Sequence, residues 1–127
     1  MVDFRSRPGQ TPVMLDRHLQ SSIEAALADT PAVLVVGARQ TGKTTLVQAL
    51  AARRSGSTYA TLDDLTALEA ATADPGGFVA GRGMAIIDEI QKAPTLLPAI
   101  KASIDRDRRP GRFLLTRPSS KPMSRPF

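Results

Sequence analysis

The sequence contains no cysteine, no tryptophan and only one tyrosine among its 127 residues. Without cysteine, the chain can form no disulfide, no zinc site with thiolate ligands and no cysteine nucleophile. Because aromatic residues make up only 4% of the chain, its core has to be built mainly from aliphatic side chains. These absences exclude disulfide-stabilised scaffolds, thiolate zinc domains and cysteine-dependent enzymes.

Long apolar runs are also absent from the sequence. No stretch approaches the ~18 consecutive apolar residues of a membrane-spanning helix. The first ten residues lack the apolar segment of a secretory signal. We therefore expect a cytoplasmic protein with no membrane partner. With 42% hydrophobic and 23% charged residues, the chain has the length and composition of one globular domain.

The net charge of +5 is unevenly distributed along the chain. Residues 1–100 hold 9 Lys and Arg against 10 Asp and Glu, whereas residues 101–127 hold 8 basic against 2 acidic residues. Four of these basic residues could contact nucleic-acid phosphates: Arg106, Arg108, Arg109 and Arg112. An exposed helix end and strand start explain them equally well, and no aromatic residue is interleaved among them to stack on bases.

The most informative stretch runs from Val33 to Thr44 and reads V-L-V-V-G-A-R-Q-T-G-K-T. The apolar run from Ala32 to Val36 has the pattern of a strand buried on both faces of a parallel sheet. It leads directly into Gly-x-x-x-x-Gly-Lys-Thr, and a helical pattern follows from about Lys43. This order predicts an anion site, because the N–H groups of the loop and the positive end of the helix face the same point.

These loop residues predict a site for a nucleotide triphosphate. We expect Lys43 to reach the β- and γ-phosphates and the Thr44 hydroxyl to ligate Mg²⁺. The loop surrounds the phosphates, so the predicted nucleotide-binding residues are Gly37, Ala38, Arg39, Gln40, Thr41, Gly42, Lys43, Thr44 and Thr45. An ordinary strand-to-helix turn is the alternative explanation, but the added requirement for Lys and Thr makes a chance match rare.

A second apolar run, Met84 to Ile87, ends in Asp88 and Glu89. Acidic pairs after strands commonly face solvent. In a parallel sheet, however, the carboxyl ends of neighbouring strands converge on one ligand crevice, so this pair can face the phosphate loop. We expect Asp88 to hold Mg²⁺ through water, and Glu89 to orient and deprotonate an attacking water molecule.

The remaining patterns predict further helices and strands, and together they place the chain in the α/β class. Strands are expected over 32–36, 57–62, 84–87 and 112–116, and helices over 12–28, from 43 to the glycine at 56, after residue 64 and after Thr95. Asp63 and Asp64 are interpreted as helix caps rather than ligands. Residues 74–77 are predicted to form a turn, followed by Phe78 and Val79 covering an edge of the sheet.

Four stretches carry a family resemblance: G-A-R-Q-T-G-K-T-T-L, T-L-D-D, I-I-D-E-I-Q-K-A-P-T-L-L-P-A-I-K and G-R-F-L-L-T. They resemble the bacterial and archaeal AAA-type ATPases that carry an uncharacterised C-terminal domain. The resemblance covers roughly Leu15 to Thr116, and it is specific because Arg39-Gln40 and residues 91–94 are unusual among phosphate-loop proteins. It implies a three-layer P-loop NTPase fold with strand order 5-1-4-3-2, ATP and Mg²⁺ as ligands, and Thr116 at the polar sensor position.

The sequence departs from the family pattern at Arg117. Members usually continue Thr-Gly-Ser-Ser, whereas this chain reads T-R-P-S-S, and the fifth strand, a later arginine and the C-terminal domain have no counterpart. We therefore expect a flexible arm over 1–10, an incomplete ATPase domain over 11–116 and an irregular basic tail over 117–127, as in a truncated gene product. Strand 32–36 would then be an unpaired edge, which favours self-association or low stability.

The sequence is compatible with three functions. The first is an ATPase whose catalytic residues are Glu89, Lys43 and Thr116. Hydrolysis also needs an arginine to stabilise charge in the transition state, in cis or from a neighbour, and none here matches the family position. The second is a non-hydrolysing, nucleotide-binding remnant of a truncated ATPase gene. The third is a nucleic-acid-binding module that uses the basic end of the chain.

Overall fold

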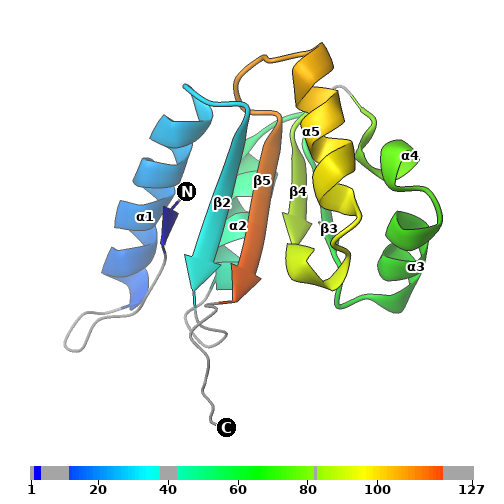
Figure 1. Ribbon diagram of the computed structural model, residues 1–127. Helices are drawn as coiled ribbons and strands as arrows, with labels where there is room; N and C mark the ends of the chain where they lie inside the picture. Colours follow the sequence, from blue (N-terminus) through cyan, green and yellow to red (C-terminus); the bar gives the residue numbers. More distant parts are fainter. Residues whose placement is uncertain (1, 4–11, 38–42, 82, 119–127) are drawn as a thin grey trace, which may run out of the picture.

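The chain folds around a parallel sheet that runs through the middle of the molecule (Figure 1). The computed structural model describes residues 2–3, 12–37, 43–81 and 83–118. In this part of the chain the strands are β1 Val2–Asp3, β2 Ala32–Gly37, β3 Thr58–Thr61, β4 Ala85–Asp88 and β5 Phe113–Pro118. They lie in the order β1-β2-β5-β4-β3, and each neighbouring pair is parallel.

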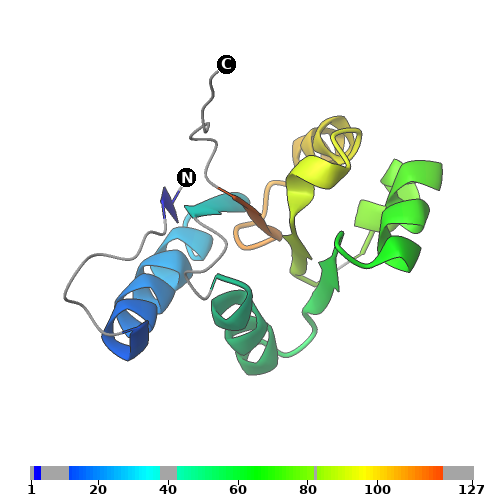
Figure 2. The same cartoon turned by 90° about the horizontal axis from the view of Figure 1, so that it is seen from below.

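Helices cover both faces of this sheet, which gives the three layers that were predicted (Figure 2). The helices are α1 Pro12–Leu27, α2 Lys43–Arg53, α3 Leu65–Ala73, α4 Pro75–Val79, the 3₁₀ helix η2 Ile90–Lys92, and α5 Leu96–Arg106. The first two lie on one face, whereas α5, α3 and α4 lie on the other. None of the helices in the described residues is long and apolar enough to cross a membrane.

Side-chain alternation along the strands separates two apolar cores. In β2, Val33 and Val35 point to the face under α1 and α2, whereas Ala32 and Leu34 point to the face under α5. The first core contains Ile23, Leu27, Val33, Val35, Leu46, Val47, Leu50, Met84, Ile86 and Leu114. The second contains Leu62, Ala71, Val79, Ile87, Ile90, Ala93, Leu96, Ile100, Phe113 and Leu115. Both cores are almost wholly aliphatic, as the composition predicts.

In the predicted order 5-1-4-3-2, strands 1 to 4 are the strands expected over 32–36, 57–62, 84–87 and 112–116. The structure confirms the order of these four, because the corresponding strands lie side by side as β2-β5-β4-β3. The predicted end of the last strand was wrong. Arg117 and Pro118, assigned from sequence to an irregular tail, continue the pairing of β5 with Val36 and Gly37. Residues 119–127 of the predicted tail lie outside the described residues.

The outer side of β2 is also different from the prediction. Val2 and Asp3, assigned from sequence to a flexible arm, form β1 and pair in parallel with Val35 and Val36. The expectation that the outer edge of β2 is wholly unpaired was therefore wrong, because two residues near the start of the chain pair with it. Their contact supports the carboxyl end of β2, from which the predicted phosphate loop departs. Residues 1 and 4–10 of the predicted arm lie outside the described residues.

The segment predicted as a turn at residues 74–77 begins a short helix instead. The Asp74 carboxylate accepts the backbone N–H of Gly77 at 3.1 Å and caps α4, with Pro75 at its start. Proline suits this position because its missing N–H would have no partner within the helix. Val79 is buried in the core under α5, so this turn of helix closes the side of the second core.

Candidate active site

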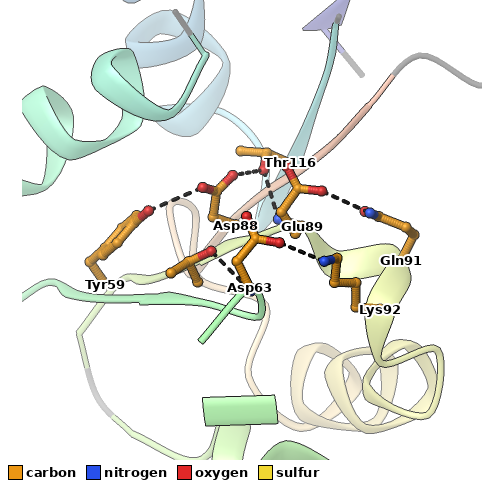
Figure 3. A network of polar contacts seen from close by, with 8 residues as sticks. Tyr59, Asp63, Asp88, Glu89, Gln91, Lys92 and Thr116 are labelled. Atoms are coloured by element: carbon orange, nitrogen blue, oxygen red, sulfur yellow. Dashed lines mark hydrogen bonds and ion pairs between the residues drawn. The ribbon is translucent and has the colours of Figure 1, made fainter. Parts of the chain in front are cut away.

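Asp88 ends β4, and Thr116 lies next to it, two residues before the end of β5 (Figure 3). Their predecessors Ile87 and Leu115 are partners in the register of the two strands. Both polar side chains are buried, with exposed fractions of 1% for Asp88 and 0% for Thr116. The two neighbouring strands therefore bring both polar side chains to the carboxyl side of the sheet.

Strand geometry places both side chains on the face that α2 covers. Residues two apart on a strand point to the same face. Ile86 and Leu114, two positions before Asp88 and Thr116, belong to the core under α1 and α2. Asp88 and Thr116 therefore face the same layer as the helix that begins at Lys43.

The Thr116 hydroxyl links the two acidic residues. It donates a hydrogen bond to Oδ1 of Asp88, and its oxygen accepts the backbone N–H of Glu89 at 3.0 Å. A hydroxyl group has a single proton to donate, so this proton is committed to Asp88. The structure thus gives Thr116 a role in holding the acidic pair together. Its predicted role as a sensor of the nucleotide stays a prediction.

Glu89 has a left-handed backbone conformation, with φ 64° and ψ 48°. Such a conformation costs about 1–2 kcal/mol for a residue with a side chain. Within the described residues, it is the single non-glycine residue with positive φ. Its carboxylate is buried, with an exposed fraction of 3%, and its Oε1 accepts a hydrogen bond from Nε2 of Gln91 at 2.8 Å. Strain of this kind is typical of functional sites, where the surrounding structure maintains it.

Tyr59 of β3 reaches Asp88 from the side opposite Thr116. Its hydroxyl donates to Oδ2 of Asp88 at 3.1 Å. Burial, the negative charge of Asp88 and this hydrogen bond raise the pKa of Tyr59 to about 12, whereas hydrogen bonding with Gln48 and Thr61 opposes the rise. Sequence reasoning missed Tyr59. The available signal was its place in a predicted strand, two residues before the T-L-D-D stretch.

The two aspartates of that stretch have different roles. Asp64 accepts the backbone N–H of Thr66 at 3.4 Å and caps α3, which confirms its predicted role. Asp63 instead forms an ion pair with Lys92, with 2.6 Å between Oδ1 and Nζ. This pair connects the end of β3 to η2 beside the site (Figure 3). Thr95 precedes α5 as predicted, but its side chain makes no capping hydrogen bond.

Only part of the predicted phosphate loop lies in the described residues. Gly37 ends β2 and is buried, and Lys43 and Thr44 occupy the first turn of α2. Thr45, which follows them, is exposed on α2. The remaining nucleotide-binding candidates, Ala38, Arg39, Gln40, Thr41 and Gly42, lie outside the described residues. The strand and the helix on either side of the predicted loop are both present in the required order.

The Asp88 carboxylate at the end of β4 is of the kind that Mg²⁺ binds. The Thr44 hydroxyl stays a predicted ligand from the sequence. Mg²⁺ prefers oxygen ligands and is commonly bound by one or two carboxylates together with substrate phosphates. Among the described residues, no group of three or more His, Cys, Asp or Glu is arranged to hold a metal.

The basic residues near the end of the chain do not share one role. Arg112 is buried and donates to the carbonyl oxygens of Ser103 and Asp107 at 2.7 and 2.9 Å and to Oγ of Ser103 at 2.7 Å. Its guanidinium also lies over the Phe113 ring, 5.1 Å from the centroid. The suggested contact with nucleic acid is therefore wrong for Arg112.

The neighbouring arginines lie on the surface. Arg108 contacts Oδ1 of Asp105 at 3.4 Å, and Arg109 contacts Oδ2 of Asp107 at 2.8 Å. Backbone and side-chain hydrogen bonds from Arg109 hold the pKa of Asp107 below its ordinary value, although burial opposes this shift. These ion pairs offset part of the positive charge at this end of the molecule.

Comparison with known proteins identifies the family. A family model described as an AAA domain matches residues 29–126, which is most of the chain. The chain belongs to the AAA domain family. The matched residues continue beyond Thr116, where the resemblance seen in the sequence ended.

Two curated relatives are similar to this AAA domain. An uncharacterized protein of Mycobacterium bovis and one of Mycobacterium tuberculosis are each 34% identical to it over 100 residues. The aligned region covers 78% of this chain but only 22% of each relative. The chain therefore spans about a fifth of the length of the curated relatives that it matches. No solved structure matches it significantly.

Proposed function

We propose that this AAA domain binds ATP together with Mg²⁺ and hydrolyses the bond between the β- and γ-phosphates. One observation carries the proposal: Asp88 and Glu89 are buried and held by Thr116 at the carboxyl end of the sheet, on the side of the helix that begins at Lys43. An acidic pair at this position can serve the phosphates that the Gly-x-x-x-x-Gly-Lys-Thr loop would hold.

The binding half of the proposal rests on the loop and the metal ligands. Lys43 would reach the β- and γ-phosphates, and Thr44 and Asp88 would hold Mg²⁺, with Asp88 acting through water. When bound, the metal neutralises charge on the phosphate oxygens. The backbone amides of residues 37–45 would enclose the phosphates at the start of α2, where the helix dipole favours an anion.

The hydrolytic half assigns Glu89 as the general base. Its carboxylate takes a proton from water while the water oxygen forms a bond to the γ-phosphorus. The bond from that phosphorus to the bridging oxygen breaks, and its electrons remain with ADP as the leaving group. The Glu89 backbone is fixed by the hydrogen bond to Thr116, and its Oε1 is held by Gln91, so the base has a defined position.

The test combines nucleotide binding with phosphate release. A fluorescent ATP analogue with Mg²⁺ is titrated into the wild type, Lys43→Ala and Glu89→Gln, and phosphate release from ATP is measured on the same samples. We expect Lys43→Ala to lose binding. Glu89→Gln should retain binding while turnover falls by about 10²–10⁴-fold, the usual contribution of a general base. Glu69→Gln is the matched control, because Glu69 is exposed on α3, and it should behave as the wild type.

The alternative is a domain that binds nucleotide without hydrolysing it. The observation that favours it lies in the sequence, where no arginine matches the family position of the one that stabilises charge in the transition state. Wild-type binding without phosphate release supports this alternative. A specific activity that rises with protein concentration would instead indicate an arginine supplied by a second copy. Absence of nucleotide binding in the wild type contradicts both functions.

A further inference from the structure

We propose that Tyr59 is a positioning residue for Asp88, orienting its carboxylate so that Mg²⁺ strengthens the binding of nucleotide. This inference rests on the proposed Mg²⁺ and ATP site. Tyr59 belongs to neither the predicted phosphate loop nor the acidic pair. It reaches the site from β3, the strand on the far side of β4 from β5 (Figure 1).

Each carboxylate oxygen of Asp88 receives a hydroxyl from a different neighbouring strand. Tyr59 donates to Oδ2 at 3.1 Å, and Thr116 donates to Oδ1 (Figure 3). A hydroxyl donor on each side favours one rotation of the carboxylate plane about the bond between Cβ and Cγ. Removing the Tyr59 hydroxyl takes away the donor that β3 supplies to Oδ2, so this rotation is favoured less strongly.

Tyr59 contacts the Asp88 carboxylate through its hydroxyl group. Its ring packs against the core under α1 and α2 and is only partly buried. A hydroxyl at such a position can bond to water, yet here it is directed at a buried carboxylate. Phenylalanine retains the ring and removes only the hydroxyl, so Tyr59→Phe separates the positioning role from the packing role.

Groups that hydrogen-bond to a metal-binding carboxylate typically change metal affinity by about 10–100-fold when they are removed. Tyr59→Phe leaves Asp88 and Thr116 in place, so we expect the lower end of this range. The midpoint of the Mg²⁺ titration at fixed nucleotide should rise about 10-fold. Nucleotide affinity without metal should stay at the wild-type value, because no part of the predicted phosphate loop is altered.

The experiment measures binding of a fluorescent ATP analogue across a Mg²⁺ series for the wild type, Tyr59→Phe and Thr58→Val. Thr58 is exposed on the same strand, so Thr58→Val removes a hydroxyl from β3 without touching Asp88 and should keep the wild-type midpoint. A higher Mg²⁺ midpoint confined to Tyr59→Phe supports the proposal. An unchanged midpoint in Tyr59→Phe overturns it, and so does an equal loss of affinity with and without Mg²⁺.

Nucleotide binding by the wild type, measured with and without Mg²⁺, distinguishes failure of this inference from failure of the proposed function. If the wild type binds no nucleotide, both are overturned. If it binds nucleotide equally well with and without Mg²⁺, the Tyr59 inference fails while nucleotide binding stands. If it responds to Mg²⁺ and Tyr59→Phe responds identically, only the role of Tyr59 is wrong.

A second measurement keeps the proposal testable if Tyr59→Phe does not fold. Tyr59 is the only tyrosine and the chain has no tryptophan, so intrinsic emission reports on this one side chain. With saturating non-fluorescent nucleotide, adding Mg²⁺ should change the tyrosine emission of the wild type, and Asp88→Asn should abolish that change. Wild-type emission that is indifferent to Mg²⁺ overturns the proposal.

Discussion

Thr116 donates a hydrogen bond to Asp88 from the adjacent strand, and the same oxygen accepts the backbone N–H of Glu89. One hydroxyl thus holds both the carboxylate that is proposed to bind Mg²⁺ through water and the backbone of the proposed base. This connection explains how two acidic residues adjacent in sequence keep separate, defined positions at the end of one strand. It also makes the stability of the carboxyl side of the sheet depend on a buried polar group, the Thr116 hydroxyl.

Replacing Thr116 with valine should destabilise the protein more than replacing it with serine. Valine has nearly the same shape but takes away one hydrogen bond from Asp88 and one from Glu89. We expect a loss of about 1–3 kcal/mol in the free energy of unfolding. Serine keeps the hydroxyl and removes one methyl group, which costs about 1 kcal/mol. Urea denaturation measures both values.

Thr95→Val is the control for this pair of variants. Thr95 is exposed and makes no side-chain capping hydrogen bond, so its replacement should stay within about 0.5 kcal/mol of the wild type. If Thr116→Val were no less stable than Thr116→Ser, the hydroxyl would have no measurable role in holding the acidic pair.

The left-handed backbone of Glu89 predicts an unusual order of stability between two substitutions. Glycine adopts a φ of 64° freely, whereas alanine is strained there. We therefore expect Glu89→Gly to be more stable than Glu89→Ala by about 1 kcal/mol, as measured by chemical denaturation. Both variants remove the carboxylate, so the comparison isolates the backbone.

Within a helix, glycine should instead be less stable than alanine. Ala102 is exposed on α5, and Ala102→Gly should lower stability by about 1 kcal/mol. A Glu89→Ala variant that is more stable than Glu89→Gly would show that residue 89 has no left-handed strain in solution.

Arg112 should contribute to stability rather than to polyanion binding. Arg112→Met retains much of the aliphatic length but removes the donors to Ser103 and to the Asp107 carbonyl. We expect the free energy of unfolding to fall by about 2–3 kcal/mol. Arg108→Met is the matched control, since the Arg108 side chain is 74% exposed, and it should change stability by less than about 0.5 kcal/mol. Equal effects of the two variants would contradict the burial of Arg112.

Tyr59 should ionise at an unusually high pH in the metal-free protein. Its ordinary pKa near 10 is raised to about 12, so the tyrosinate absorbance should develop around that pH while circular dichroism reports a folded chain. Because the pKa is higher in the folded state, the associated stability is fully present below pH 10 and is lost as the pH rises through 12. Asp88→Asn removes the charge and should lower this pKa.

The absorbance readout belongs to one residue, because the chain has one tyrosine and no tryptophan. A native midpoint near the ordinary value, or a midpoint that Asp88→Asn leaves unchanged, would contradict the contact between Tyr59 and Asp88.

Local patterns were sufficient to predict much of this fold. The run before Gly37 and the helix from Lys43 are each encoded by neighbouring residues, and both appear as predicted. Asp88 could be found because it follows an apolar run, and strand ends converge in a parallel sheet. By contrast, β1 was missed because a strand of two residues shows no periodicity, and the predicted turn at Asp74 is a short helix because its carboxylate caps Gly77.

The sequence by itself determined the order of strand, glycine loop and helix, the parallel α/β class and the acidic pair at the end of β4. The tertiary structure alone decided that Tyr59 and Thr116 meet Asp88 from opposite sides and that Arg112 turns inward. Tyr59 and Thr116 are 29 and 28 positions from Asp88 along the chain. Spacing within a helix or strand reports which side chains share a face, but contacts at such separations exist only once the strands have taken their places in the sheet.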